Sequence, residues 1–552
     1  MTGHSTLRET QAIGSDDGAI VTDSANDPPP PWWSAFRSPN FSVIWAASTA
    51  GLICIAMSDT ASGWLMTSLN ADPAAVSMVQ VATNLPMFLF TLLAGALADI
   101  FDPRRFLLVV ETSVAILTLF FAGMVSIAAI TPVSLLAITF AVSAIWTMAA
   151  PAWLSITPAL VAKRDLDGAT AINGASYNIS RALGPALGGG AIAAFGLAAP
   201  YWIFSAANLA AILALLWWRS PRKAPESLPM ERLGGALRTG LRHAANNVHL
   251  SSTLARTLAF FPFASAYWAL MPLVARNQMN GGSQYFGVLL GAIGAGAMGG
   301  ALMLNWLKAR LGPDGVVAAG TAATAVVLAL LGVARDPTLG AVLCLIGGVA
   351  WILVLASLYV SAQVALPDWV RGRGLAIFLT VIFGAMTAGS VVWGQIAGAW
   401  GLPTALFAAA AGILIGGPLS WRWKIQTGAH VDLSPSLHWS RPHVDHHIDD
   451  REGPILVTVE YRVDGANRAA FLRAIEEIAH ERKRDGAYAW GVFEDATNKE
   501  RYWETFLIES WLELQHLRER VTKSDRLLEN NVRLLLEEAP RPNFMVRSRS
   551  SP

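Results

Sequence analysis

Long apolar runs separated by short polar loops occupy most of this 552-residue chain. A helix needs roughly 20 apolar residues to cross the hydrocarbon core of a bilayer. Twelve such runs therefore predict an all-α polytopic membrane protein with twelve transmembrane helices. The runs lie at 41–67, 74–97, 106–129, 133–153, 168–195, 199–218, 251–275, 284–307, 315–334, 338–362, 374–400 and 402–422.

The first six runs resemble the last six at one gapless offset of 205 residues, as from Gly95 to Gly300. Such parallel six-helix repeats are an architecture of secondary transporters, with the substrate path between the halves. Accidental similarity between apolar helices is the alternative. The matches are Gly95, Ala96 and Leu97 with Gly300, Ala301 and Leu302, Arg105 with Arg310, Trp146 with Trp351, and Gly184, Gly189 and Gly196 with Gly389, Gly394 and Gly401.

The remaining segments differ in composition from the apolar runs. The N-terminal segment is polar and rich in Ser and Asp, which predicts disorder. A basic connector between the repeats predicts a solvated surface helix. The predicted units are a disordered tail 1–33, a first six-helix repeat 34–218, a cytoplasmic connector 219–250, a second repeat 251–425, a linker 426–451 and a soluble domain 452–552.

The final segment alternates apolar and polar residues, as strands do. "ILVTVEYRVD", "AYAWGVFED", "RYWETFLIES" and "NFMVRS" predict four strands. Helical patterns at 469–482 and 511–538 lie between them. The order β-α-β-β-α-β is that of a ferredoxin-like unit, so we expect an α+β domain of that class.

Basic residues are concentrated in alternate loops, and the positive-inside rule assigns those loops to the cytoplasm. The outer loops would then hold only Arg276 and Arg335. This bias predicts a multi-pass protein of the cell inner membrane with both termini in the cytoplasm. The inner loops would hold Arg104, Arg105, Lys163, Arg164, the group from Arg219 to Arg242, Lys308, Arg310, Arg371, Arg373, Arg422 and Lys424.

Composition excludes several classes of protein. Hydrophobic residues make up 53% of the chain and charged residues 14%, which is too apolar for a soluble protein of this length. The expected surroundings are a lipid bilayer, and nothing indicates a nucleic-acid partner. The two cysteines lie in apolar runs, and no Cys/His spacing typical of a metal site is present. We predict no catalytic residue, no metal and no cofactor.

The loop between the second and third runs carries a charged motif, "GALADIFDPRR". Gly95, Asp99, Arg104 and Arg105 resemble the pattern Gly-x-x-x-Asp-Arg-x-Gly-Arg-Arg of the major facilitator superfamily. Ile100 and Asp102-Pro103 depart from it. The resemblance implies a gating loop, with Asp99 holding the two halves together across their seam, so that Asp99→Ala shifts the conformational balance.

A second motif, "SRALGPALGGG", lies in the fifth run. Gly184, Pro185, Gly188 and Gly189 are similar to the glycine-proline motif of proton-driven exporters in this superfamily. Residues 34–425 resemble the branch that holds enterobactin exporters and transmembrane secretion effectors. The tail is similar to the antibiotic-biosynthesis-monooxygenase type of dimeric α/β barrel.

Ionisable residues inside the runs are costly unless they are paired or hydrated, so they indicate function. Asp59, Glu111 and Arg181 are the candidates in the first repeat. Asp59, or Glu111 as second choice, would bind and release a proton while Arg181 responds to substrate. The alternatives for Asp59 are a fixed ion pair with Arg181 or a position near the outer lipid headgroups, and the alternative for Glu111 is a pairing with Arg105.

The resemblance implies a secondary active transporter and not an enzyme. It would export a small amphipathic compound, drug-like or siderophore-like, by alternating access coupled to protons. Abundant tryptophans, including Trp268 and Trp351, suit such a substrate path. Two alternatives stay open for the tail. It could be an anchored monooxygenase using His516, Trp490, Trp503 and Trp511, or a regulatory module that forms a homodimer.

Overall fold

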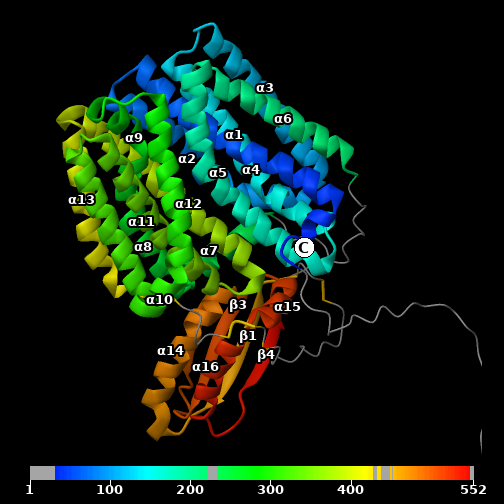
Figure 1. Ribbon diagram of the computed structural model, residues 1–552. Coiled ribbons are helices and arrows are strands. Elements are labelled where there is room, and N and C mark those ends of the chain that lie inside the picture. The colour runs from blue at the N-terminus through cyan, green and yellow to red at the C-terminus, as the bar shows by residue number, and fades with distance from the viewer. Residues whose placement is uncertain are drawn as a thin grey trace, which may run out of the picture.

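Helices form a large bundle, and a smaller sheet-containing tail lies against one end of it (Figure 1). The computed structural model describes residues 31–219, 233–426, 432–434, 436, 448–449 and 452–547, and the side chains of 95–100, 233–237, 239, 518–519 and 541 lie outside that description. Most of the predicted N-terminal tail lies outside it too. We call the end of the bundle beside the tail the tail end, and the opposite end the far end.

Proline and short polar side chains define where the helices of the first half begin. Ser38, Asp102 and Thr131 cap three helices, each followed directly by a proline that tolerates the first helical turn. The elements are η1 (Ser34–Arg37), α1 (Pro39–Leu69), α2 (Pro73–Ile100), α3 (Pro103–Ser126), α4 (Pro132–Leu160), η2 (Lys163–Asp165), α5 (Leu166–Phe195) and α6 (Ala199–Trp217).

The second half begins at Asn247, whose side chain caps α8. Its elements are α8 (Val248–Ala269), α9 (Met271–Leu273), the π-helix η3 (Val274–Gln278), α10 (Ser283–Val333), α11 (Pro337–Val364), α12 (Asp368–Trp400), α13 (Leu402–Leu419) and η4 (Ser420–Arg422).

Within the described residues, ten helices are long and apolar enough to cross a membrane. Two features distinguish this set from the predicted runs. The 30-residue α5 is not among the ten, and it carries Asp167, Arg181 and many small polar residues. The 51-residue α10 covers two predicted runs and departs from helical geometry at Gly312, where φ is 71°.

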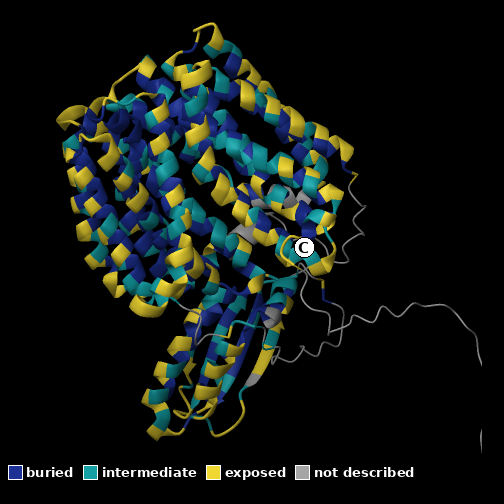
Figure 2. Ribbon diagram, viewed as in Figure 1, coloured by how far each residue is buried: buried dark blue, intermediate teal, exposed yellow. Residues whose placement is uncertain are grey.

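The two halves meet through two antiparallel helix pairs, α2 with α12 and α5 with α10. Gly394 of α12 lies beside Ser77, and Gly384 beside Phe88. The other pair brings Gly189 of α5 to Gly287 of α10. Exposed residues cover the outside of the bundle and buried residues fill its interior (Figure 2).

The tail is a four-stranded antiparallel sheet of order β2-β3-β1-β4 with helices packed on it (Figure 1). One long helix was expected after β3, but two are observed. The first ends at Arg520, where Val521 turns to an extended conformation, and Thr522 forms a capping box with Asp525 that begins the second. The elements are β1 (Ile455–Arg462), η5 (Gly465–Asn467), α14 (Arg468–Asp485), β2 (Tyr488–Glu494), β3 (Arg501–Ile508), α15 (Trp511–Arg520), α16 (Lys523–Arg533) and β4 (Arg541–Val546).

The connector helix α7 (Leu233–Asn246) joins the tail to the second half. Its Arg242 donates a 2.6 Å hydrogen bond to the Gly486 carbonyl, and Arg238 forms a 2.6 Å ion pair with Glu509. The same helix packs against α12, where Gly240 lies beside Arg373. The expectation of a solvated connector helix is therefore wrong, because α7 lies between the tail and the bundle.

His243 of α7 is completely buried at this junction. Its ring packs edge-on against Trp369 at 5.4 Å, and its Nε2 lies 3.3 Å from the Asn247 amide nitrogen. Its Nδ1 lies 4.0 Å from the Asp485 carboxylate of the tail. Burial, with the nearby Arg484 and Arg520 guanidinium groups, lowers the pKa of His243 to about 3.

Other charged groups surround His243. Arg484 bonds both Asp485 and Asp525, and Arg520 lies 4.4 Å over the Trp369 ring. Burial raises the pKa of Asp485. For Glu481, burial and the nearby Asp525 carboxylate raise the pKa to about 9. The charged groups that act on both acids, Arg484 and Asp525 among them, also belong to the tail, so these two shifts arise within the tail.

We predict that acid weakens docking of the tail through His243. The docked pKa is about 3 and the ordinary value 6.5, so the undocked state takes up the proton first. Docking is then strongest above pH 6.5 and loses about 2 kcal/mol from this residue at pH 5. Spin labels on the exposed Leu241 and Leu472 would report a broader distance distribution at pH 5 than at pH 7.5. His243→Gln should remove that broadening, and equal broadening in both proteins would contradict the assignment.

Candidate functional site

The seam between α5 and α10 is a contact between backbones. A Cβ placed on Gly189 would lie 2.6 Å from the Ser283 carbonyl oxygen, and one on Gly287 would lie 2.7 Å from the Pro185 carbonyl oxygen. A Cβ on Gly294 would lie 2.4 Å from the Cα of Ala182. Small residues allow this approach, which larger side chains would prevent.

The glycine contacts repeat between the halves at the offset of 205 residues. Gly184 faces α1 within its own half, and Gly389 faces Pro262 of α8 in the same way. Gly189 faces α10 across the seam, while Gly394 faces Ser77 of α2 across it. Helices α5 and α12 therefore carry equivalent pairs of contacts, one within a half and one between halves.

Gly184 and Gly188 bring α5 against α1. A Cβ on Gly184 would lie 2.5 Å from the Cβ of Ala56, and one on Gly188 would lie 3.0 Å from the Cα of Met57. Pro185 lies inside the helix between them, where it removes one backbone hydrogen bond. The motif residues thus lie at two helix contacts, one on each side of α5.

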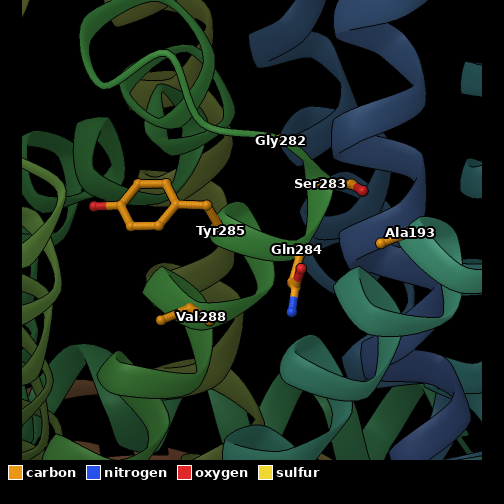
Figure 3. Close-up of a pocket in the computed structure, with 6 residues that line it drawn as sticks. All are labelled: Ala193, Gly282, Ser283, Gln284, Tyr285 and Val288. Carbon is orange, nitrogen blue, oxygen red and sulfur yellow. The ribbon is translucent and has the colours of Figure 1, made fainter.

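A pocket of about 390 Å³ lies at the far end of the α5–α10 seam. Ala193 lines it from α5, and the side chains of Ser283, Gln284, Tyr285 and Val288 line it from the start of α10, with Gly282 above them (Figure 3). Ala193 is about 18 Å along α5 from Arg181. The pocket is therefore separate from the charged residue in the middle of the helix.

Arg181 lies halfway along α5 and reaches the second half. Its guanidinium lies 5.6 Å over the ring of Trp268 in α8 and 5.8 Å over Tyr177. Trp268 packs against Trp351 of α11 with ring centroids 5.4 Å apart. Phe261 lies 5.3 Å from Trp351 on its other side. A cation from one half thus meets aromatic rings of the other half.

Asp59 lies in the middle of α1. It is the one exposed residue in the stretch 47–67 of that helix. Protein nevertheless surrounds it, and Tyr201 of α6 is one neighbour. Among the described side chains Asp59 forms no ion pair with Arg181. The alternative of a fixed pair is therefore not observed, and an accessible carboxylate lies within the first half.

Glu111 has a different environment. It is 3% exposed on α3, and the indole of Trp153 in α4 lies beside it. Arg105 is exposed at the start of the same helix, and the two form no ion pair within the part of the chain that the structure describes. The expected pairing of Glu111 with Arg105 is not observed.

The gating motif is described only in part. Gly95 and Asp99 lie in the last turns of α2, but their side chains are outside the described residues. Arg104 donates hydrogen bonds of 2.8 and 3.0 Å to the carbonyls of Leu215 and Leu216, which end α6. A cation at a helix C-terminus is favourable, so Arg104 acts within the first half.

The departure at Asp102-Pro103 has a structural reason. The Asp102 side chain accepts a 2.9 Å hydrogen bond from the Arg105 backbone N–H and caps α3. Pro103 follows at the first helical position, where its missing N–H costs nothing. These two residues begin the helix that presents Arg104 to α6.

The profile of the family described as "Transmembrane secretion effector" matches residues 31–549. The chain belongs to this family. It is a multi-pass membrane transporter of the major facilitator type, and this family holds transporters, not enzymes. That assignment confirms the resemblance found in the membrane part of the sequence.

Relatives and solved structures are similar to the helical bundle. The enterobactin exporter EntS of Escherichia coli O1:K1 is 26% identical over 346 residues, which is 61% of this chain and 80% of that protein. Its counterpart from Citrobacter koseri is 25% identical over 342 residues, again 61% and 80% of the two chains.

A bacterial homologue of the human lysosomal transporter Spinster aligns with TM-score 0.56 and 15% identity over 70% of this chain and 97% of that one. An auto-inhibited POT family peptide transporter aligns with TM-score 0.57 and 14% identity over 71% and 98%. The structural likeness shows the fold of the bundle.

One ion pair in this transporter was missed from the sequence. Arg256 of α8 bonds Asp314 of α10 at 2.8 Å, and it lies 5.6 Å from the ring of Trp421. Asp314 follows the helix break at Gly312 and also accepts from the Ile425 N–H at 3.3 Å. Two features of the sequence could have indicated this ion pair. Arg256 is a basic residue in an apolar run, and Asp314 is an acid directly after Gly312-Pro313.

We predict that a side chain at Gly189 opens the α5–α10 seam. Gly189→Val would force its Cβ against the backbone of Ser283 and Gly287, while Gly190→Val has nothing within 4 Å of its Cβ and serves as control. Overpacking costs roughly 1–3 kcal/mol. A maleimide should label Ser283→Cys several-fold faster in detergent-solubilised Gly189→Val than in Gly190→Val. Equal labelling would show that the seam does not depend on close backbone contact.

Proposed function

We propose that this transporter exports a small amphipathic compound, drug-like or siderophore-like, by alternating access. The contact of Arg181 with Trp268 carries the proposal, because it lies mid-bundle and joins the two halves. Aromatic surface suits an apolar ligand body, and one cation suits a polar group on it. The relatives named enterobactin exporter support export over import.

The proposed topology has twelve spans in two six-helix repeats, in the inner membrane, with both termini in the cytoplasm. It counts α5 as a span and divides α10 at Gly312 into two. The tail then lies in the cytoplasm, and the far end faces outward. The repeated contacts of Gly184 and Gly389, and of Gly189 and Gly394, support equivalent halves.

In this orientation the structure has its outer side closed. Cross-seam contacts run from the Arg276–Thr67 hydrogen bond of 2.9 Å at the far end to Gly294 beside Ala182. Toward the tail end, Gly174 and Asn178 of α5 are exposed. Opening the outside requires the glycine seams to part, while the contacts of α5 with α1 and of α12 with α8 stay within the halves.

Asp59 is the proposed site of proton coupling, with Glu111 as second choice. It is accessible although protein surrounds it, so it can exchange a proton with water in the interior. Glu111 is buried beside Trp153 and lacks that access. Small movements of the halves would change the hydration of Asp59, and hydration controls the affinity of a carboxylate for a proton.

For the tail we propose a ferredoxin-like domain that pairs two copies of the transporter. Helices cover one sheet face. The other face carries two apolar groups, Phe493 opposite Trp503 and Leu456 opposite both Leu507 and Met545, with the pair of Thr458 and Thr505 between them. Phe493 is 60% exposed. A second copy of this face would cover both groups, which favours a dimerisation role over the monooxygenase alternative.

The proposed function predicts a drug or siderophore phenotype. A strain lacking the gene, profiled against a panel of siderophores and amphipathic drugs, should retain at least one of them in the cell. Expression of the full chain should restore its release. Measurable uptake with no compound released would reverse the direction of transport and contradict the proposal.

Proton coupling predicts a specific loss in Asp59→Asn. The amide keeps the size of the side chain but cannot release a proton, so proton-driven uptake of an identified substrate into everted vesicles should fall at least tenfold. Exchange of labelled for unlabelled substrate without a proton gradient should persist. Glu111→Gln is the matched control. Intact proton-driven uptake in Asp59→Asn would remove Asp59 from the coupling mechanism.

Dimerisation predicts that Phe493→Asp yields monomers of the full-length protein in detergent. Phe493 lies on the edge strand β2, and a charge there would be desolvated where the two sheets pair. Light scattering should give twice the mass of one chain for the wild type. Leu534→Asp is the control, because Leu534 is 83% exposed and lies outside the sheet, and it should also give twice that mass. A wild-type monomer would contradict pairing through the tail.

A further inference from the structure

Among the residues that the structure describes, Arg181 is a cation in the middle of the apolar bundle with no acidic partner. It has neither an ion pair nor a hydrogen bond among the described residues, and the two aromatic rings are its recorded contacts. A charge at this depth is costly unless an opposite charge or water compensates it. Cation–π contacts offset only part of that cost.

The acids of the first half do not supply the missing charge. Asp59 forms no ion pair with Arg181 in the described structure, and Glu111 is buried next to Trp153. Asp99 has no described side chain, but it lies one residue from the tail end of α2. Arg181 lies 15 residues into α5 from that end, about 22 Å along the helix axis.

The groups around Arg181 are mainly hydrogen-bond donors. A guanidinium has five N–H donors and no acceptor, and an indole has one donor. The indole nitrogens of Trp268 and Trp351 have no hydrogen-bond partner among the described residues. Phe261, which packs edge-on against Trp351, contributes only ring surface. A ligand that satisfies this cluster must bring acceptor atoms and negative charge.

The shape of the cluster favours a flat ligand. Trp268 is partly exposed and meets the ring of Trp351 at 74°, while Trp351 and Phe261 are buried, so the Trp268 ring is the surface left for an aromatic body. The planar fork of arginine binds a carboxylate with two parallel hydrogen bonds. Both features lie across the seam, so a ligand here would contact both halves.

We propose that Arg181, with Trp268 and Trp351, binds the carboxylate of a planar aromatic anion, and that such anions are the substrate class of this transporter. The inference rests on the proposed function and specifies its ligand. The anion replaces the cation–π contacts of Arg181 with a charged, bidentate pair, while the ligand's ring packs against Trp268. Neutral analogues of equal shape lack the charge that compensates Arg181.

Binding of two matched probes to the purified full-length protein tests this site. 1-Naphthoate should bind at least tenfold more tightly than 1-naphthamide, which has the same rings without the charge. Arg181→Gln should remove that preference, and Arg181→Lys should keep part of it because the charge remains without the fork. Trp268→Phe keeps a ring but loses the N–H and should weaken naphthoate several-fold.

Arg276→Gln is the matched control, because Arg276 also lies over a tryptophan, Trp64 at 5.9 Å, but at the far end and bonded to Thr67. It should leave both affinities unchanged. Thermal unfolding of each variant shows whether it is folded. If Arg181→Gln does not fold, the comparison of the two probes in Arg181→Lys supplies the test. Equal affinity for the two probes, or a preference that survives in folded Arg181→Gln, would overturn the proposal.

Transport separates this inference from the proposed function. If naphthoate binds through Arg181 but vesicles move no compound, the binding site stands and the export function fails. If vesicles export neutral amphipathic compounds equally well in wild type and Arg181→Gln, export stands and the anion site is wrong.

Discussion

Close contact between glycine-bearing backbones is the interaction on which this architecture depends. At Gly189 and Gly287 helices of opposite halves meet backbone to backbone, and at Gly394 the missing side chain makes room for Ser77 of the other half. Such contacts are stabilised by packing at short range and can separate without pulling large groups out of pockets. The glycines on the other side of α5, at Gly184 and Gly188, hold that helix to α1 by the same means. Helix α5 is therefore packed against α1 of its own half on one side and forms the seam with α10 of the other half on the other side.

Among the described residues, the bonds that hold the tail to the bundle go to α7 and the second half, and this determines how the tail can move. Its recorded bonds to the bundle run through α7, with Arg242 on Gly486 and Arg238 on Glu509, and Trp369 of α12 stacks with Arg520. The Arg238–Glu509 pair is exposed, but His243 and Arg520 are buried at this junction and hold the tail against the second half. If the halves rock as proposed, the tail travels with the second half. Pairing of two tails would then link the second halves of two transporters and leave both first halves free.

The sequence was most informative where one local pattern decides the structure. Apolar length predicted the helices, and Asp102-Pro103 begins α3 as a cap and a first-turn proline do. It could not predict contacts that join distant residues without a charge pattern. His243 was not recognised because its partners, Trp369 and Asp485, lie on other elements, and the connector looked solvated. Arg181 stood out as a cation in an apolar run, but an aromatic partner such as Trp268 has no signal of its own. The split of α15 from α16 depends on one threonine cap that a continuous helical pattern conceals.

The position of Arg181 joins the ligand question to the seam. Gly294 of α10 approaches the backbone of Arg181 and Ala182 so closely that a Cβ there would lie 2.7 Å from the Arg181 carbonyl oxygen. The guanidinium of the same residue contacts Trp268 of the second half. Any ligand that moves this side chain therefore acts within one residue of the contact that closes the far end. A ligand shifts a conformational equilibrium only by binding the two states with different affinity, and a site made from both halves necessarily changes when they rock. Binding at Arg181 and opening of the seam, both as proposed, need no long pathway between them, because Arg181 contacts Trp268 and also lies at the seam.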